Sequence, residues 1–163
     1  MFAVAVAAYL VAVMQRTSLG VAAVEATDRF EVTAAALSSL AVAQIIVYAV
    51  LQVPVGVLLD RTGPRLLLVV GAVLMAVGQV TLAFAPSVGV ALFARVLVGA
   101  GDAMTFISAV RFLSNWFDGK MLPIVTQLLG TAGAFGQVLS ALPLALILHS
   151  AGWSAAYLSA AGL

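Results

Sequence analysis

Three charged side chains lie inside apolar segments of this sequence, and they are the residues best suited to chemistry. Arg16 interrupts the first apolar segment, and Arg95 and Asp102 interrupt the fourth. A charge at the centre of a membrane-spanning helix costs at least about 2.5–3.5 kcal/mol, so it must face a cavity or a partner. A planar guanidinium with five N–H donors suits a carboxylate, phosphate or nitrate, so we expect Arg16 to bind an anion.

The spacing of Arg95 and Asp102 favours a shared cavity over a mutual salt bridge. Seven residues separate them, which is two helical turns and about 10 Å along the axis on one face. An alternative is that all three charges only hydrogen-bond to neighbouring helices and hold the bundle together. We favour that structural role for Arg95. For Asp102, proton carriage and a structural role both stay open.

A row of uncharged polar residues follows the second apolar segment. Gln44, Tyr48 and Gln52 recur every four residues and therefore share one helix face. They could contact a substrate. They could equally make helix–helix hydrogen bonds in lipid, which contribute roughly 0.6 kcal/mol each.

Composition predicts the class of protein that positions these residues. The chain is 64% hydrophobic and 8% charged, with a mean hydropathy of +1.22, whereas soluble domains average about a quarter charged residues. Apolar stretches of about 20 residues recur, enough to cross the hydrocarbon as helices. The absence of cysteine excludes disulfides and thiolate metal sites. The net charge of +1 offers no basic patch for nucleic acid. We expect an all-α polytopic bundle in a lipid bilayer, with no cofactor or metal.

The expected spans are separated by short polar segments. They fall at 2–24, 34–59, 66–85, 88–113 and 121–149, with a sixth beginning over 153–163. An acidic loop over 25–31 is expected after the first span. Between the second and third spans, Gly63 should supply a permissive turn backbone and Pro64 should open the next helix, where its missing N–H costs nothing.

Basic residues predict the orientation. Arg61 and Arg65 lie in the second polar segment, and Arg111 and Lys120 flank the connection after the fourth span. The opposite side has one arginine, Arg29, among three acidic residues. By the positive-inside tendency, the basic segments and the N-terminus should be cytoplasmic.

Four patterns resemble the major facilitator superfamily of transporters. They are Tyr48-x3-Gln52-x-Pro54-x-Gly56-x3-Asp60, Arg95-x3-Gly99-x-Gly101-Asp102, Trp116-Phe117 and Gly152-Trp153-x3-Tyr157. They are similar, in this order, to the end of superfamily helix 2, the helix 4 motif, the aromatic pair after it and the start of helix 6. The segment Asp60-Arg61-Thr62-Gly63-Pro64-Arg65 looks like the loop that joins helices 2 and 3.

The resemblance implies a fold and a mechanism. Superfamily members have about twelve helices in two halves, each built from inverted repeats. Residues 1–163 would then be an N-terminal half that works with a C-terminal half. The halves would rock about a central site, and the 60–65 loop would latch the inward side through Asp60, Arg61, Gly63 and Arg65. Asp60 would accept hydrogen bonds from a helix N-terminus or an arginine. In relatives, the Arg95 motif packs near this loop.

Within the superfamily, the chain is most similar to anion-handling symporters. Their mid-membrane arginine in helix 1 and acidic residue in helix 4 correspond to Arg16 and Asp102. Asp118 departs from this pattern, because proline often follows Trp-Phe. Helix 5 also lacks the Gly-Pro pair of drug antiporters, which argues against multidrug efflux.

The expected function is therefore secondary active transport of a small anion, coupled to a proton or another cation. Because the chain has one histidine and no cysteine, an integral-membrane enzyme is a poor alternative. An efflux or other-solute permease, and a truncated fragment that does not transport, remain alternatives. The last expected span has only eleven residues, about 16 Å of helix, so we expect a fragment of a longer protein or a truncated gene model.

The orientation can be tested by thiol labelling, since the chain has no native cysteine. Thr62→Cys should be protected from an impermeant thiol reagent in whole cells, whereas Asp28→Cys should react. Permeabilised cells, in which both sites should react, are the control. Labelling of position 62 from outside an intact cell would show that the orientation is the reverse of the predicted one.

Overall fold

The computed structural model describes residues 2–163, with side chains described from residue 6 onward. This part of the chain forms six helices and no strand, which confirms the all-α prediction. The helices are α1 (Phe2–Val21), α2 (Ala23–Phe30), α3 (Ala34–Thr62), α4 (Pro64–Ala83), α5 (Val88–Ser114) and α6 (Leu122–Ala161).

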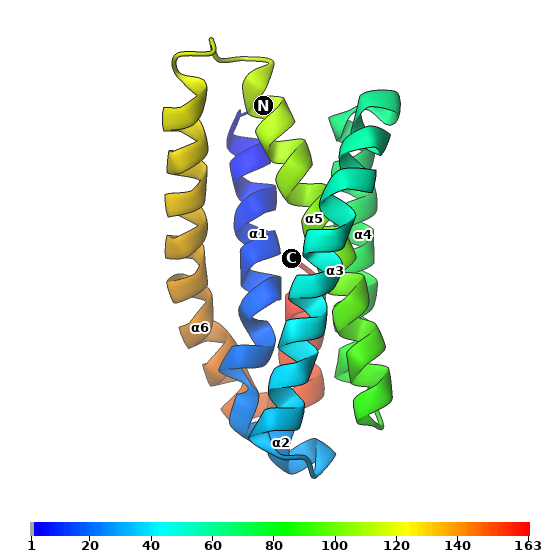
Figure 1. Cartoon of the computed structure of the whole chain (residues 1–163). Coiled ribbons are helices and arrows are strands. Elements are labelled where there is room, and N and C mark those ends of the chain that lie inside the picture. Colours follow the sequence, from blue (N-terminus) through cyan, green and yellow to red (C-terminus); the bar gives the residue numbers. More distant parts are fainter. Residues whose placement is uncertain (1) are drawn as a thin grey trace.

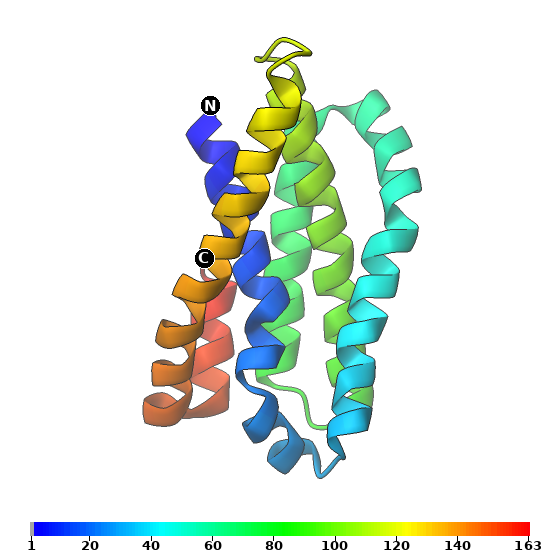
Figure 2. The ribbon, with the colours of Figure 1, turned by 60° about the vertical axis from the view of Figure 1, so that its left-hand side comes forward.

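Helix α5 is the centre of the bundle. It packs against α4, α3 and α1, and α6 packs along α1 (Figures 1 and 2). The α3–α4 turn, the α5–α6 connection and the N-terminal end of α1 lie at one end of the bundle (Figure 1). Helix α2, the α4–α5 turn and a sharp bend in α6 lie at the other end. The basic segments are thus at one end and the acidic α2 at the opposite end.

The outer surface is apolar along much of its length. Four described helices, α3 to α6, are long and apolar enough to cross a membrane, and α1 with α2 makes a fifth if that pair, bent by 56°, counts as one span. Large aliphatic side chains lie on the outside of α3, α4 and α6, for example Val53, Val69 and Leu142 at 76%, 62% and 71% exposure. Such a surface is unfavourable in water and matches a hydrocarbon environment.

The turn between α3 and α4 has the expected conformation. Gly63 has φ 79° and ψ 162°, and its N–H donates to the Leu59 carbonyl at 2.9 Å. A residue with a Cβ atom rarely adopts this φ. Pro64 then begins α4.

The expectation of an acidic loop over 25–31 is wrong, because Ala23–Phe30 forms helix α2. Ala22 and Ala26 are 1% and 0% exposed and pack into the core, while Glu25 and Asp28 face outward to different degrees. The helix ends at Glu31, whose backbone is left-handed at φ 51°. The loop prediction took these charges as a sign of irregular structure. A short amphipathic helix instead buries its alanine face and turns its charged face outward.

The bend in α6 brings its last turns back against α1 and α4. Gly152 has φ 82° and ψ −179°, so the chain reverses there. After the reversal, Trp153 Nε1 donates to the Leu82 carbonyl and Ser154 Oγ to the Ala83 carbonyl, both at 2.9 Å. These carbonyls belong to the last turn of α4. The carbonyl groups of the last turn of a helix have no N–H partner within their own helix. Tyr157 Oη donates to the Ser18 carbonyl at 3.3 Å.

Helices α4 and α5 approach each other through glycine. A Cβ at Gly101 would collide with the Gly71 carbonyl oxygen and lie 2.6 Å from Met75 Cγ. In lipid, water provides little drive for helices to associate, so close backbone contact of this kind is a principal source of stability.

Gly101→Ala should therefore destabilise the bundle by about 1–3 kcal/mol, the usual cost of overpacking. Gly130→Ala is the matched control, since no atom lies within 4 Å of its Cβ position. It should be neutral or stabilising by up to about 1 kcal/mol because alanine favours helix. Thermal unfolding in one detergent measures both. Equal midpoints for the two variants would contradict the close contact.

Candidate functional site

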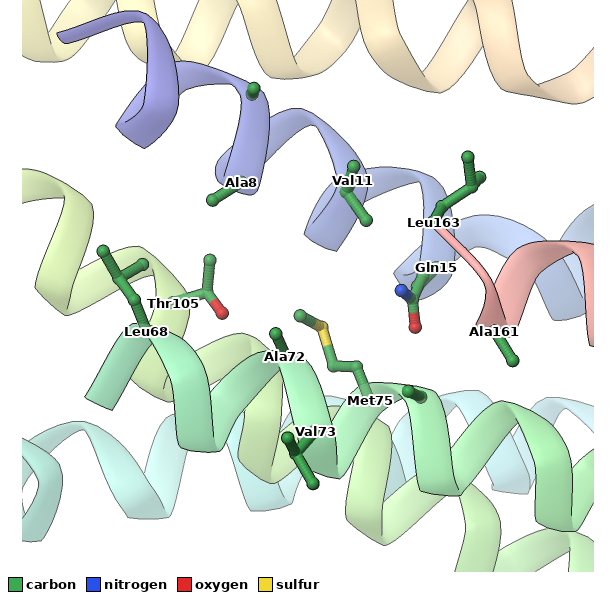
Figure 3. A pocket seen from close by; sticks show the side chains of 12 residues that line it. Ala8, Val11, Gln15, Leu68, Ala72, Val73, Met75, Thr105, Ala161 and Leu163 are labelled. Atoms are coloured by element: carbon green, nitrogen blue, oxygen red, sulfur yellow. The ribbon is translucent and has the colours of Figure 1, made fainter. Parts of the chain in front are cut away.

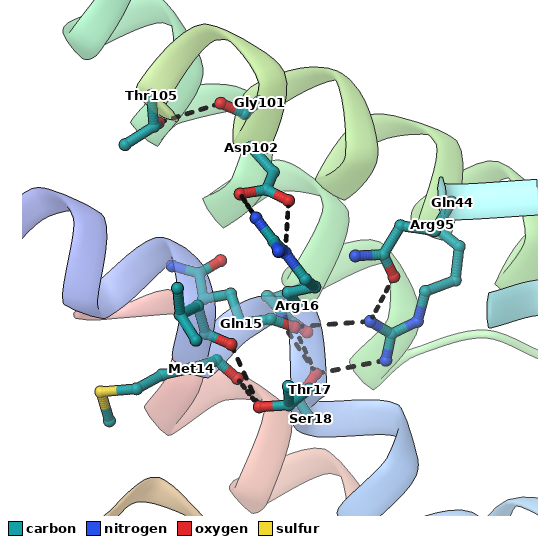
Figure 4. A network of polar contacts seen from close by, with 12 residues as sticks. Met14, Gln15, Arg16, Thr17, Ser18, Gln44, Arg95, Gly101, Asp102 and Thr105 are labelled. Atoms are coloured by element: carbon teal, nitrogen blue, oxygen red, sulfur yellow. Dashed lines mark hydrogen bonds and ion pairs between the residues drawn. The ribbon is translucent and has the colours of Figure 1, made fainter. Parts of the chain in front are cut away.

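Arg16 and Asp102 form a bidentate ion pair between α1 and α5. Arg16 Nε donates to Oδ2 at 2.6 Å and Nη2 to Oδ1 at 2.8 Å (Figure 4). The Asp102 side chain is 2% exposed, and that of Arg16 is 33% exposed. The carboxylate is buried, and the guanidinium reaches from it toward a more open region.

The pair occupies only one edge of the Arg16 guanidinium. Of its five N–H donors, two face Asp102, and one N–H of Nη1 together with the second N–H of Nη2 forms a separate edge. The Tyr48 ring lies against the same group, with its centroid 5.0 Å from Cζ, and contributes a cation–π interaction. Tyr48 and Tyr9 both pack on Phe106, with ring centroids 6.4 and 5.6 Å away. This aromatic group limits the positions that Arg16 can adopt.

A cavity of about 440 Å³ lies beside Arg16, between α1, α3 and α6. Its wall is formed by Arg16, Thr17, Gly20, Val21, Ala41, Gln44, Ile45, Gln137 and Ala141. The structure thus brings Gln44 to the same cavity as Arg16, as the spacing of polar residues on α3 allowed. Gln52 lies two turns further along α3 and is partly buried.

Sequence reasoning missed Gln137, which reaches the cavity from α6. Its signal was an amide among glycines and alanines in a mostly apolar span that also contains Gln127, and the small residues of this span were interpreted as helix packing. Gln137 adds a donor and an acceptor to the cavity wall.

Arg95 is fully buried and contacts only uncharged groups. Its Nη1 donates to Gln44 Oε1 at 3.2 Å and to the Gln15 carbonyl at 3.4 Å, and its Nη2 donates to Ser18 Oγ at 3.2 Å (Figure 4). The side chain is 0% exposed. Arg95 thus joins α5 to α1 and α3, as expected for a structural role, but it does so in the middle of the bundle.

Gln79 completes this polar network from α4. Its Nε2 donates to the Gln15 carbonyl at 3.1 Å and to Ser18 Oγ at 3.2 Å. Sequence reasoning did not select Gln15, Ser18 or Gln79. They could have been recognised in the sequence, because a polar residue within a membrane-spanning segment needs a hydrogen-bond partner.

A second ion pair lies at the basic end of the bundle. Arg111 Nη2, near the end of α5, pairs with Asp60 Oδ1, at the end of α3. Both side chains are substantially exposed, at 48% and 64%. The structure therefore supplies an arginine for Asp60 from within this chain. In this chain Arg111, rather than Arg95, contacts the 60–65 loop.

The remaining loop residues surround a smaller pocket at the same end. Gly63 and Arg65 line about 330 Å³ together with Trp116 and four neighbours. Arg61 lies in the last turn of α3 and is exposed.

Another cavity, about 470 Å³ between α1 and α4, is a poor candidate for charged ligands (Figure 3). Alanine, valine, leucine and methionine side chains form most of its wall. Its polar members are Gln15 and Thr105, and the Thr105 hydroxyl donates to the Gly101 carbonyl at 2.9 Å. Over the residues with described side chains, no group of three His, Cys, Asp or Glu could hold a metal ion.

The sequence profile of the Major Facilitator Superfamily matches residues 5–163, nearly the entire chain. The chain belongs to this family. The resemblance seen in the four sequence patterns is thereby confirmed, and the family assignment together with the apolar helices supports a multi-pass membrane protein.

Three relatives carry transporter names. An uncharacterized transporter, YybO, of Bacillus subtilis is 28% identical over 144 residues, which are 88% of this chain and 33% of the relative. A probable L-galactonate transporter of Escherichia coli is 26% identical over 146 residues, 90% of this chain and 32% of the relative. A probable sulfoacetate transporter, SauU, of Cupriavidus necator is 25% identical over 150 residues, 92% and 35%. The chain spans about a third of the length of these relatives.

In a transporter of this family, Asp60→Asn tests whether the Asp60–Arg111 pair matters for movement. Exposed ion pairs contribute at most about 1 kcal/mol to stability, so Asp60→Asn should insert and unfold like wild type. We expect it to reduce the transport rate of the full-length protein, measured as uptake per inserted molecule, and Arg111→Gln should reproduce the loss.

Asp118→Asn is the matched control, an exposed carboxylate at the same end of the bundle. It should transport at the wild-type rate. Wild-type rates for Asp60→Asn would show that the 60–65 turn is an ordinary loop.

Proposed function

We propose that the protein moves a small anionic solute across the membrane by alternating access, coupled to a proton or another cation. The observation that carries this proposal is the free edge of the Arg16 guanidinium beside a 440 Å³ cavity. Asp102 occupies the Nε edge, so the Nη edge offers two parallel N–H groups to a carboxylate or another oxyanion. A bidentate bond of this kind is both strong and directional.

The charge of the bundle interior supports an anion. Arg16, Arg95 and Asp102 are the charged groups in the middle of the helices, with a sum of +1. An unbalanced positive charge is costly in a low-dielectric interior, and an incoming anion would offset it. Two relatives are named for galactonate and sulfoacetate, which are organic anions.

Asp102 is the candidate site for the coupling proton. In its charged form it holds Arg16 through two hydrogen bonds. Protonation would end the ion pair and free the guanidinium, so that proton and anion binding would favour each other. Coupling of this kind is reciprocal by linkage.

The transport movement is proposed from the family. The six-helix bundle would rock against a C-terminal half around the cavity, with the Asp60–Arg111 end facing the cytoplasm. Four basic and two acidic side chains gather at that end, a sum of +2, whereas α2 and Glu31 carry −2 at the other end.

Arg16→Lys tests the anion site, because it keeps the charge and removes the paired N–H edge. We expect binding of a carboxylate to the full-length protein to weaken at least tenfold, since a charge-assisted hydrogen bond contributes about 1.5–3 kcal/mol. Arg16→Ala should abolish uptake. Asp102→Asn should still bind the anion, but its uptake should no longer respond to the proton gradient.

Arg29→Lys is the control, the same substitution at an arginine outside the cavity, and its affinity should be unchanged. Binding is measured by calorimetry across carboxylates, phosphate, nitrate and neutral sugars. Equal affinity of wild type and Arg16→Lys, or preference for a neutral solute, would reduce Arg16 to a structural partner of Asp102.

A further inference from the structure

We propose that Arg95 and Gly99 hold the Gln44 amide so that its NH₂ group binds a second oxygen of the transported anion. The substrate would then be an organic acid with a hydroxyl or carbonyl oxygen in addition to its anionic group. This inference rests on the proposed function, in which Arg16 binds the anionic group. It adds a specificity-determining residue, Gln44, and a positioning residue, Arg95.

The direction of the Gln44 amide follows from the chemistry of its partner. Arg95 Nη1 lies 3.2 Å from Gln44 Oε1. A guanidinium has only donors, so the amide must turn its oxygen toward it, whichever way the two amide atoms would otherwise be assigned. Figure 4 shows the oxygen facing Arg95 and the nitrogen on the other side of the amide group.

Gly99 fixes the rest of the side chain. A Cβ at Gly99 would lie 2.6 Å from the Gln44 carbonyl oxygen and 3.2 Å from Gln44 Cγ. Glycine therefore lets α3 lie directly against α5 at this point. Arg95 and Gly99 are one helical turn apart, so one face of α5 holds both ends of the Gln44 side chain.

The donor side of the amide lacks an acceptor. Gln44 is 3% exposed, and its Nε2 has no hydrogen-bond partner among the described side chains and backbone. A buried donor without a partner costs about 1–3 kcal/mol. Gln44 also forms part of the cavity wall that contains Arg16. An oxygen of a solute bound to Arg16 would supply this acceptor.

The choice of glutamine agrees with a binding role. If position 44 served only to satisfy Arg95, a carboxylate would do so better, since it would also neutralise the buried charge. A carboxylate, however, has no N–H to offer the cavity. Glutamine accepts from Arg95 with one atom and keeps a donor on the other.

Affinity for a six-carbon aldonate and its monodeoxy analogues tests the inference in the full-length protein. Wild type should bind the aldonate about five- to tenfold more tightly than at least one analogue, the loss expected for one hydrogen bond. Gln44→Met keeps the side-chain length and removes the donor. It should reduce this ratio to within twofold while leaving affinity for that analogue nearly unchanged.

Gln79→Met is the matched control, because Gln79 is a buried amide of the same network that does not line the cavity. It should keep the wild-type ratio. Arg95→Met should reduce the ratio as Gln44→Met does, and it should cause no further reduction in a Gln44→Met background. A purely structural Arg95 would instead weaken all ligands equally. If Arg95→Met does not fold, Gly99→Ala replaces it and should also reduce the ratio.

The outcomes separate the two proposals. If anions bind through Arg16 but hydroxylated and deoxy acids bind equally, or the preference survives in Gln44→Met, this inference is overturned and the proposed function stands. If no anion binds, or binding does not depend on Arg16, both are overturned.

Discussion

The positive charge buried in the middle of the bundle is the constraint on which the other polar contacts depend. Arg95 and Asp102 are buried and Arg16 is partly buried beside a cavity, and Asp102 can neutralise only one of the two guanidiniums. Arg16 takes the carboxylate, so Arg95 must be satisfied by neutral acceptors. Two of these come from α1 and one from α3. The buried arginine thereby fixes which faces of three helices meet.

This constraint explains the spacing of the motif Arg95-x3-Gly99-x-Gly101-Asp102. Arg95 and Gly99 contact Gln44 on α3, and Asp102 binds Arg16 on α1. Gly101 points to the opposite side of α5, where it lies against Gly71 of α4. The four positions of the motif thus set contacts of the central helix with α1, α3 and α4. The glycines allow close approach of α3 and α4, and the charged side chains bind α1.

The sequence predicted local features well, because their causes are local. The turn at Gly63 and the start of α4 at Pro64 depend on backbone preferences of single residues. The partner of Asp60 was harder to predict from the sequence, since Arg111 lies 51 positions away. An arginine elsewhere in the chain could have formed the same ion pair. Helix α2 was missed because its charges resemble a loop, and only its burial of Ala22 and Ala26 reveals the amphipathic face.

The two ion pairs also differ in what they can contribute to transport. Both join α5 to another helix within this chain, so rocking of the whole bundle against another domain need not break either one. A solute or proton that changes the Arg16–Asp102 pair acts on α1 and α5 inside the bundle. The Asp60–Arg111 pair links α3 to the last turn of the same α5, whereas Asp102 lies near its middle. A shift of α5 caused at Asp102 would therefore reach Arg111 through nine residues of one continuous helix, about 14 Å along its axis. The central helix, rather than direct contact between the pairs, is the physical connection between solute binding and the 60–65 turn in the proposed mechanism.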